Sequence, residues 1–136
     1  MIFFGANDAC LPGISTGQHV PIDRYVQNLK ELIEHPTVRE QKPRLILVTP
    51  PPVDEYKLEE SGPGSDSSEV QRTAEHTKKY ADACRKLGAD LDMVVVDLWS
   101  IFMTRAGWKH GQPLAGSKSV ERSKTLGVLL SDGKSE

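Results

Sequence analysis

Three short runs of apolar residues stand out along the chain, and each ends at polar or turn-forming residues. They cover residues 2–4, 44–49 and 93–96. Continuous apolar runs of this length are typical of parallel strands that are covered on both faces. The first run stops at Gly5, and the second stops at three consecutive prolines that begin with Pro50. The pattern therefore predicts three buried strands with abrupt ends.

Two amphipathic segments with helical spacing lie between these runs. The first covers residues 22–33. Its apolar positions share one side of a helix: Tyr25, Leu29, Leu32 and Ile33. We expect Pro36 to end this helix and residues 37–43 to form a charged connector. A second helix is predicted over residues 70–87, with Gly88 capping its end.

The order of strands and helices indicates the fold class. Strand, helix, strand, helix, strand is typical of a doubly wound α/β domain, in which right-handed crossovers make consecutive strands parallel. At this length, residues 1–136 form one domain. Residues 57–69 are polar and rich in glycine and serine, which predicts a flexible loop. Further helices are expected over residues 98–103 and within residues 120–130.

Composition narrows the range of partners. The formal net charge is −2 with a pI of about 6.1, and charges of both signs are mixed along the chain, which argues against a nucleic-acid partner. No charged start is followed by a long apolar stretch, so neither a signal peptide nor a membrane span is predicted. The chain has no glycine-rich phosphate-binding motif, and we expect no cofactor.

The cysteine content indicates a reducing environment. Cys10 and Cys84 are too few for a disulfide scaffold and form no C-x-x-C metal pattern, so we expect no metal and a cytoplasmic location. The helical spacing places Cys84 in the core. Cys10 follows the turn after the first strand, where it either lines a pocket or is a free structural thiol.

Two polar residues at the expected ends of strands are candidate site residues. In open α/β sheets, sites lie at the carboxyl ends of the strands. Asn7 follows Gly5 there, so it can stabilise an oxyanion, or else only turn the chain or cap a helix. Asp97 ends the third run and is a site residue or, as the commoner role, a helix cap.

The histidines carry weaker signals. His19 lies in a loop, where histidines are usually surface residues or structural hydrogen bonders. His76 is offset from the apolar face of its predicted helix, so we expect it to be exposed, and we expect the same of His110. The serines of the polar loop are poor nucleophile candidates, because nothing rigid would hold a base against them.

Five segments carry a resemblance to a known family. In chain order they are residues 2–9 (IFFGANDA), 18–21 (QHVP), 48–55 (VTPPPVDE), 96–99 (VDLW) and 129–133 (LLSDG). Their order and intervals resemble the SGNH (GDSL-type) hydrolases, and within them the isoamyl acetate-hydrolysing esterases. The match covers nearly the whole chain, and several segments in register are far more specific than any one of them.

The resemblance implies a three-layer α/β/α, flavodoxin-like fold and hydrolysis of small, acetate-type esters without a cofactor. Within that family, the block around Gly5 and Asn7 supplies the oxyanion asparagine. Asp132 matches the aspartate of the catalytic triad. The prolines after the second strand then shape the acyl or alcohol pocket.

The sequence also departs from the family pattern. It has no G-D-S block, and Ser135 stands where the family has its histidine. The chain starts where the family's third strand starts, so the first two strands, the nucleophile and the last helix are missing. We therefore expect a chain truncated at both ends and catalytically inactive. The strand of Ile2, Phe3 and Phe4 would be an exposed edge, prone to self-association. The alternative is a non-catalytic binding relative that uses the residual pocket or this edge.

Overall fold

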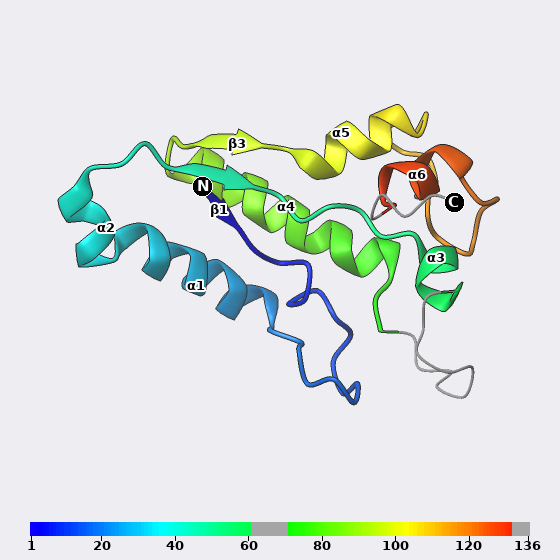
Figure 1. Ribbon diagram of the computed structural model, residues 1–136, viewed down its shortest axis with the longest axis horizontal. Helices are drawn as coiled ribbons and strands as arrows, with labels where there is room; N and C mark the ends of the chain where they lie inside the picture. Colours follow the sequence, from blue (N-terminus) through cyan, green and yellow to red (C-terminus); the bar gives the residue numbers. More distant parts are fainter. Residues whose placement is uncertain (61–70, 132–136) are drawn as a thin grey trace.

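The computed structural model describes residues 1–60 and 71–131, and Figure 1 shows how its elements are arranged. The strands are β1 (Ile2–Phe3), β2 (Ile46–Val48) and β3 (Val94–Val96). The helices are α1 (Ile22–Glu34), α2 (Pro36–Gln41), α3 (Glu55–Glu60), α4 (Ala74–Asp90), α5 (Leu98–Arg105) and α6 (Lys124–Leu129). The predicted alternation of strands and helices is therefore present, and the α/β class is confirmed.

The strands form one parallel sheet in the order β1-β2-β3. Ile2 lies beside Leu47, and Phe3 lies beside Val48. Leu47 in turn lies beside Val95. The first apolar run therefore lies alongside the second, the consecutive strands are parallel as predicted, and β1 is an edge strand of the described sheet.

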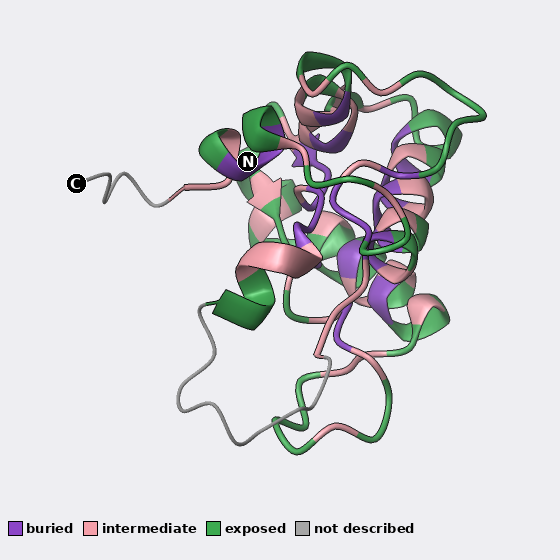
Figure 2. Cartoon of the chain, turned by 90° about the vertical axis from the view of Figure 1, so that its right-hand side faces the viewer, coloured by how far each residue is buried: buried purple, intermediate pink, exposed green. Residues whose placement is uncertain are grey.

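One face of the sheet is covered by α1 and α4. Ile2, Leu47 and Val95 form a row across the strands that points toward these helices, and Leu47 is fully buried. Tyr25 and Leu29 contribute the α1 side of this core. Figure 1 shows α4 running behind the strands, and Figure 2 shows the buried positions gathered on the inward sides of the helices.

Gly88 lies within α4, which continues to Asp90, so the prediction that Gly88 caps this helix is wrong. A Cβ atom at Gly88 would clash with the Val95 side chain. The glycine therefore lets the helix backbone approach β3 closely, and packing rather than capping explains its position.

The opposite face of the sheet is only partly covered in the described part of the chain: Val48 at its centre is buried, but the positions beside it are exposed. Phe3 is 45% exposed, Val94 63% and Val96 40%. The expectation of helices on both faces is met here on one face only. A second hydrophobic cluster joins α4 to α5, to α6 and to the segment between them; its buried members are Ala74, Ala81, Trp99, Met103, Leu114 and Leu126.

Several local predictions need correction. Residues 37–43 are not only a connector, because Pro36 begins α2, where a proline at the first turn is well tolerated. Residues 57–60 belong to α3 rather than to a flexible loop, and the rest of that predicted loop, 61–69, lies outside the described residues. Among residues 1–60 and 71–131, none of the helices is a candidate membrane span.

The helix starts follow ordinary capping chemistry. Thr73 accepts a hydrogen bond from the His76 N–H, and Ser123 accepts one from the Leu126 N–H. Asp97 caps α5 through the Ser100 N–H, at 3.1 Å, which confirms the commoner of its two predicted roles. It also accepts a hydrogen bond from the Thr49 hydroxyl.

Candidate functional site

Gly5 makes the sharp bend that ends β1. It is buried, with φ +115°, a region that favours glycine. A Cβ atom there would lie 2.9 Å from the Tyr25 hydroxyl oxygen and 3.2 Å from Pro50 Cγ. The Tyr25 hydroxyl also donates to the Phe4 carbonyl at 3.2 Å. A side chain at position 5 would therefore clash, so the bend requires glycine. Tyr25 of α1 holds the bend in place through its hydrogen bond to Phe4.

A compact turn follows Gly5 and holds Asn7 in place. The Ala9 N–H donates to the Gly5 carbonyl and the Cys10 N–H to the Asn7 carbonyl, both at 3.0 Å. His19 Nδ1 lies 2.6 Å from the Cys10 carbonyl oxygen. Because a carbonyl can only accept, this Nδ1 carries the hydrogen. His19 thus supports the turn, in agreement with its structural interpretation.

Asn7 itself is exposed at the carboxyl end of the sheet, and its side chain has a defined orientation. Its Oδ1 accepts a hydrogen bond from Arg72 Nη2 at 3.2 Å. Since an arginine has only donors, the atom that faces it must be the amide oxygen. The amide NH₂ group points elsewhere and has no acceptor among residues 1–60 and 71–131. Its two hydrogens are free to donate, as an oxyanion site requires.

Arg72 is a candidate site residue that the sequence analysis did not identify. Its Nε lies 3.5 Å from Cys10 Sγ, so the same guanidinium contacts both ends of the Asn7 turn. A topological signal could have found it. Arg72 directly precedes the N-cap of α4, and in a parallel α/β fold the helix starts lie at the same edge as the strand ends.

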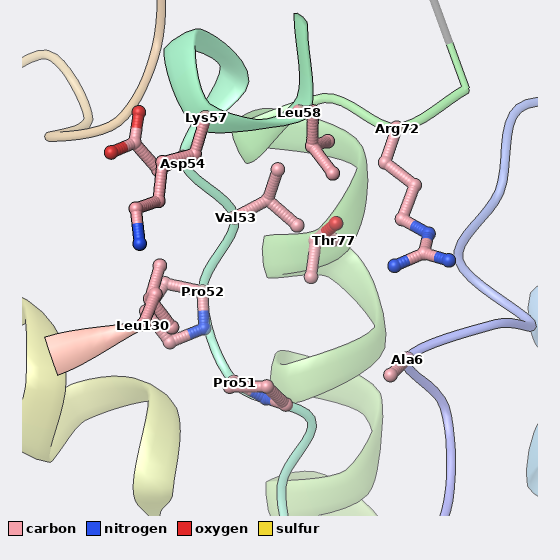
Figure 3. A pocket seen from close by; sticks show the side chains of 10 residues that line it. All are labelled: Ala6, Pro51, Pro52, Val53, Asp54, Lys57, Leu58, Arg72, Thr77 and Leu130. Carbon is pink, nitrogen blue, oxygen red and sulfur yellow. The ribbon is translucent and has the colours of Figure 1, made fainter. Parts of the chain in front are cut away.

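A cavity of about 330 Å³ opens beside this turn. That volume is at the low end of the ~300–1,000 Å³ typical of ligand sites. Ala6 and Arg72 line one side, and Pro51 and Pro52 form part of the opposite wall (Figure 3). The prolines after β2 therefore do form the wall of a pocket, as the sequence predicted. The other lining residues are Val53, Asp54, Lys57, Leu58, Thr77 and Leu130.

The third predicted site residue, Asp132, lies outside the described residues, and its role as the triad aspartate stays a prediction. Ser135, which stands at the family's histidine position, lies outside them too, as do the serines of the polar loop. In the described part, no group of three or more His, Cys, Asp or Glu side chains is arranged to hold a metal ion.

The other titratable residues considered as candidates are His76, Cys84 and His110, and none of them lines this cavity. His76 is half-buried between His19 and Tyr80, with ring centroids 5.9 and 5.4 Å away, so the prediction that it is exposed is wrong. Burial lowers the pKa of His76, and the charges of Lys79 and His19 lower it further. Burial also raises the pKa of the Cys84 thiol, which lies in the core as predicted. His110 is exposed, as expected.

Comparison with known proteins agrees with this geometry. The model of the GDSL-like Lipase/Acylhydrolase family matches residues 1–116. The GDSL esterase/lipase CPRD49 of Arabidopsis thaliana is 39% identical over 110 residues, which are 80% of this chain and 43% of that protein. The isoamyl acetate-hydrolyzing esterase 1 homologs of mouse and human are 36% and 35% identical over 101 residues, 74% of this chain and 40% of each relative.

This chain therefore spans less than half the length of these curated relatives. The matched region contains β1, the turn with Asn7, the proline wall and the start of α4. The resemblance inferred from the five segments is confirmed by both kinds of comparison. The chain belongs to the GDSL-like lipase/acylhydrolase family.

Proposed function

We propose that this chain carries the oxyanion-stabilising part of a carboxylic ester hydrolase that acts on small, acetate-type esters. The observation that supports this most is the orientation of Asn7, whose amide hydrogens are left free beside a cavity. Gly5 contributes by letting the backbone turn sharply beneath the site. The relatives are named as esterases, and two of them as isoamyl acetate-hydrolyzing, which supports the substrate class.

The chemistry in which these residues would act is acyl transfer. A serine attacks the ester carbonyl, a histidine takes and returns the proton, and an aspartate orients the histidine. Negative charge then develops on the carbonyl oxygen, and donors already in position stabilise it. In this scheme Asn7 is such a donor, and Asp132 would be the aspartate.

We further propose that the 136-residue polypeptide does not hydrolyse esters by itself. The sequence contains neither a G-D-S block nor a D-x-x-H block, so the family's nucleophile and base have no counterparts in it. Loss of either group from a triad lowers turnover by orders of magnitude.

The test is to incubate the purified polypeptide with a short-chain acetate ester and to measure acid release. We expect a rate equal to that of buffer alone, and the same rate for Asn7→Ala. Turnover above background that disappears in Asn7→Ala would show that the polypeptide has an active site of its own, and the proposal of inactivity would be wrong.

The second candidate function is binding without catalysis, and exposure of the β1 edge favours it. Phe3 is 45% and Phe4 57% exposed, and β1 pairs only with β2 in the described sheet. Such an edge can accept a further strand, including one from a second copy. Light scattering tests self-association: we expect oligomers that Phe4→Lys reduces, and a monodisperse monomer would count against this function.

The location we propose is the cytoplasm. Both cysteines, Cys10 and Cys84, are free and buried, as is usual for proteins in a reducing environment. Fractionation of cells that express the chain would test this, with recovery in the cytosolic fraction expected and recovery in a secreted or membrane fraction contradicting it.

A further inference from the structure

The guanidinium of Arg72 has one edge engaged and one edge free. Nε and Nη2, which lie on the same edge, contact Cys10 Sγ and Asn7 Oδ1. The remaining terminal nitrogen, Nη1, has no partner in residues 1–60 and 71–131. Figure 3 shows a nitrogen of Arg72 on the side that faces the cavity and Thr77. Because these two contacts hold the guanidinium in place, it presents its positive charge to the cavity, and little side-chain entropy is lost when a ligand binds.

Thr77 places a second unsatisfied polar group in the same cavity. Its residue is 1% exposed, and its hydroxyl oxygen has no hydrogen-bond partner. In Figure 3 this oxygen points into the space between Leu58 and Arg72. Leaving a buried hydroxyl without a partner is unfavourable, and in native structures such a group usually has a partner in the protein, an ordered water or a bound ligand.

The rest of the cavity wall is largely apolar. Pro51, Pro52 and Leu130 lie across the cavity from Arg72, with Leu58 between the two sides (Figure 3). Asp54 and Lys57, of opposite charge, lie on the proline side. Asp54 Oδ1 accepts from the Tyr56 N–H at 3.1 Å, and its buried Oδ2 has no hydrogen-bond partner in the described residues. The cavity thus has a donor-rich end at Arg72 and Thr77 and an alkyl-lined wall opposite.

We propose that this cavity binds a short-chain carboxylate ion, with its charge on Arg72 Nη1 and the Thr77 hydroxyl and its alkyl chain against the prolines. A carboxylate accepts hydrogen bonds only, and it carries the single negative charge that one arginine balances. Carboxylates of this kind are the acids released by ester cleavage. That link rests on the proposed function, whereas the binding of the ion does not.

Calorimetric titration of the whole chain with butyrate, and with the uncharged isostere butyramide, tests the proposal. We expect butyrate to bind at least about tenfold more tightly, because a hydrogen bond to a charged group is worth about 1.5–3 kcal/mol. Arg72→Ala should weaken butyrate binding about tenfold or more and bring the two ligands to equal affinity. Arg72→Lys, which keeps the charge, should retain part of the preference.

Lys79→Ala is the matched control. Lys79 is an exposed residue on α4, the helix that begins just after Arg72; it lies outside the cavity lining, and its loss changes the net charge as much as Arg72→Ala does. We expect the affinity for butyrate to stay within about twofold, since exposed charges at a distance are screened by salt. An effect as large as that of Arg72→Ala would mean that only the overall charge matters, and would overturn the assignment.

Thr77→Val distinguishes ligand binding from a structural role. The substitution removes the unpartnered hydroxyl and keeps the shape, so the melting temperature should be unchanged or higher. The affinity for butyrate should nevertheless fall about fivefold or more, the loss expected for about 1 kcal/mol of hydrogen bonding. Equal affinities for butyrate and butyramide in the unmodified chain, or unchanged affinity in both Arg72→Ala and Thr77→Val, would overturn the proposal. Neither outcome depends on turnover.

Discussion

The two faces of the sheet consist of the same kinds of residue but have different surroundings. On one face Ile2, Leu47 and Val95 pack against α1 and α4. On the other face only the central Val48 is buried, and its neighbours Phe3 and Val96 remain 45% and 40% exposed. The comparison shows that an apolar run identifies a strand but does not say which of its faces is covered.

The covered face is also the one that supports the candidate site. Tyr25 packs in the core beneath the sheet and donates from there to the Phe4 carbonyl, next to the Gly5 bend. Asn7 stands on the turn that follows. Changes on the covered face should therefore lower stability and disturb the Asn7 turn, whereas the same changes at the exposed positions of the other face should do neither.

Leu47→Ala should have the largest effect. Leu47 is fully buried at the centre of the covered face, so its truncation removes apolar contacts and leaves a cavity. We expect the free energy of unfolding to fall by about 2–5 kcal/mol, measured by urea denaturation followed by circular dichroism. A loss below about 1 kcal/mol would mean that the sheet and helices are not packed as described.

Gly88→Ala should come next. Alanine is a better helix former than glycine by about 0.8–1.0 kcal/mol, but a Cβ here would clash with Val95. Overpacking should dominate and lower the stability by about 1–3 kcal/mol. Gly127→Ala is the control, because a Cβ at this helical glycine would lie 3.4 Å from Asp54 Oδ2, an ordinary contact. It should be neutral or stabilising, and a stabilising Gly88→Ala would contradict close packing.

The sequence predicted what depends on local pattern. The strands, α1 and α4, the bend at Gly5 and the cap at Asp97 all follow from periodicity and turn chemistry. Arg72 could not be found in that way, because its contact with Asn7 joins residues 65 positions apart. The prediction that Gly88 caps α4 is wrong because a glycine near the end of a helix has two possible roles: it can form the C-cap, or it can let the helix pack closely against a strand. Pro36 ends one helix pattern, yet it also starts α2.

Tyr25→Phe should have a moderate effect at neutral pH. It removes the hydrogen bond to the Phe4 carbonyl and keeps the ring, so we expect a loss of about 0.5–1.5 kcal/mol. Chemical-shift changes in the amide spectrum should be centred on residues 4–10, because this bond fixes the bend before Asn7. Changes confined to α1 would show that the bond does not support the turn.

Tyr25 should also make the stability of the fold depend on pH. Burial raises the pKa of Tyr25 above its usual value of 10.0, so the folded chain keeps this proton longer than the unfolded chain. Stability that depends on it is fully present below pH 10 and declines as the pH rises above that value. Tyr25→Phe should therefore show a shallower alkaline loss of stability than the unmodified chain, in urea titrations at pH 9, 10 and about 11.

Val94→Thr should have the smallest effect. It also allows the two faces to be compared directly, because the next residue, Val95, is also a valine but points to the covered face. Val94 is 63% exposed, so a hydroxyl there remains hydrated and the stability should change by no more than about 0.5 kcal/mol. Val95 points toward Gly88 and Leu47, so Val95→Thr should cost about 1–3 kcal/mol for a hydroxyl placed among apolar groups. The two variants differ only in which face receives the oxygen. Equal losses in urea denaturation would mean that the second face is covered as well, and the distinction between the faces would fail.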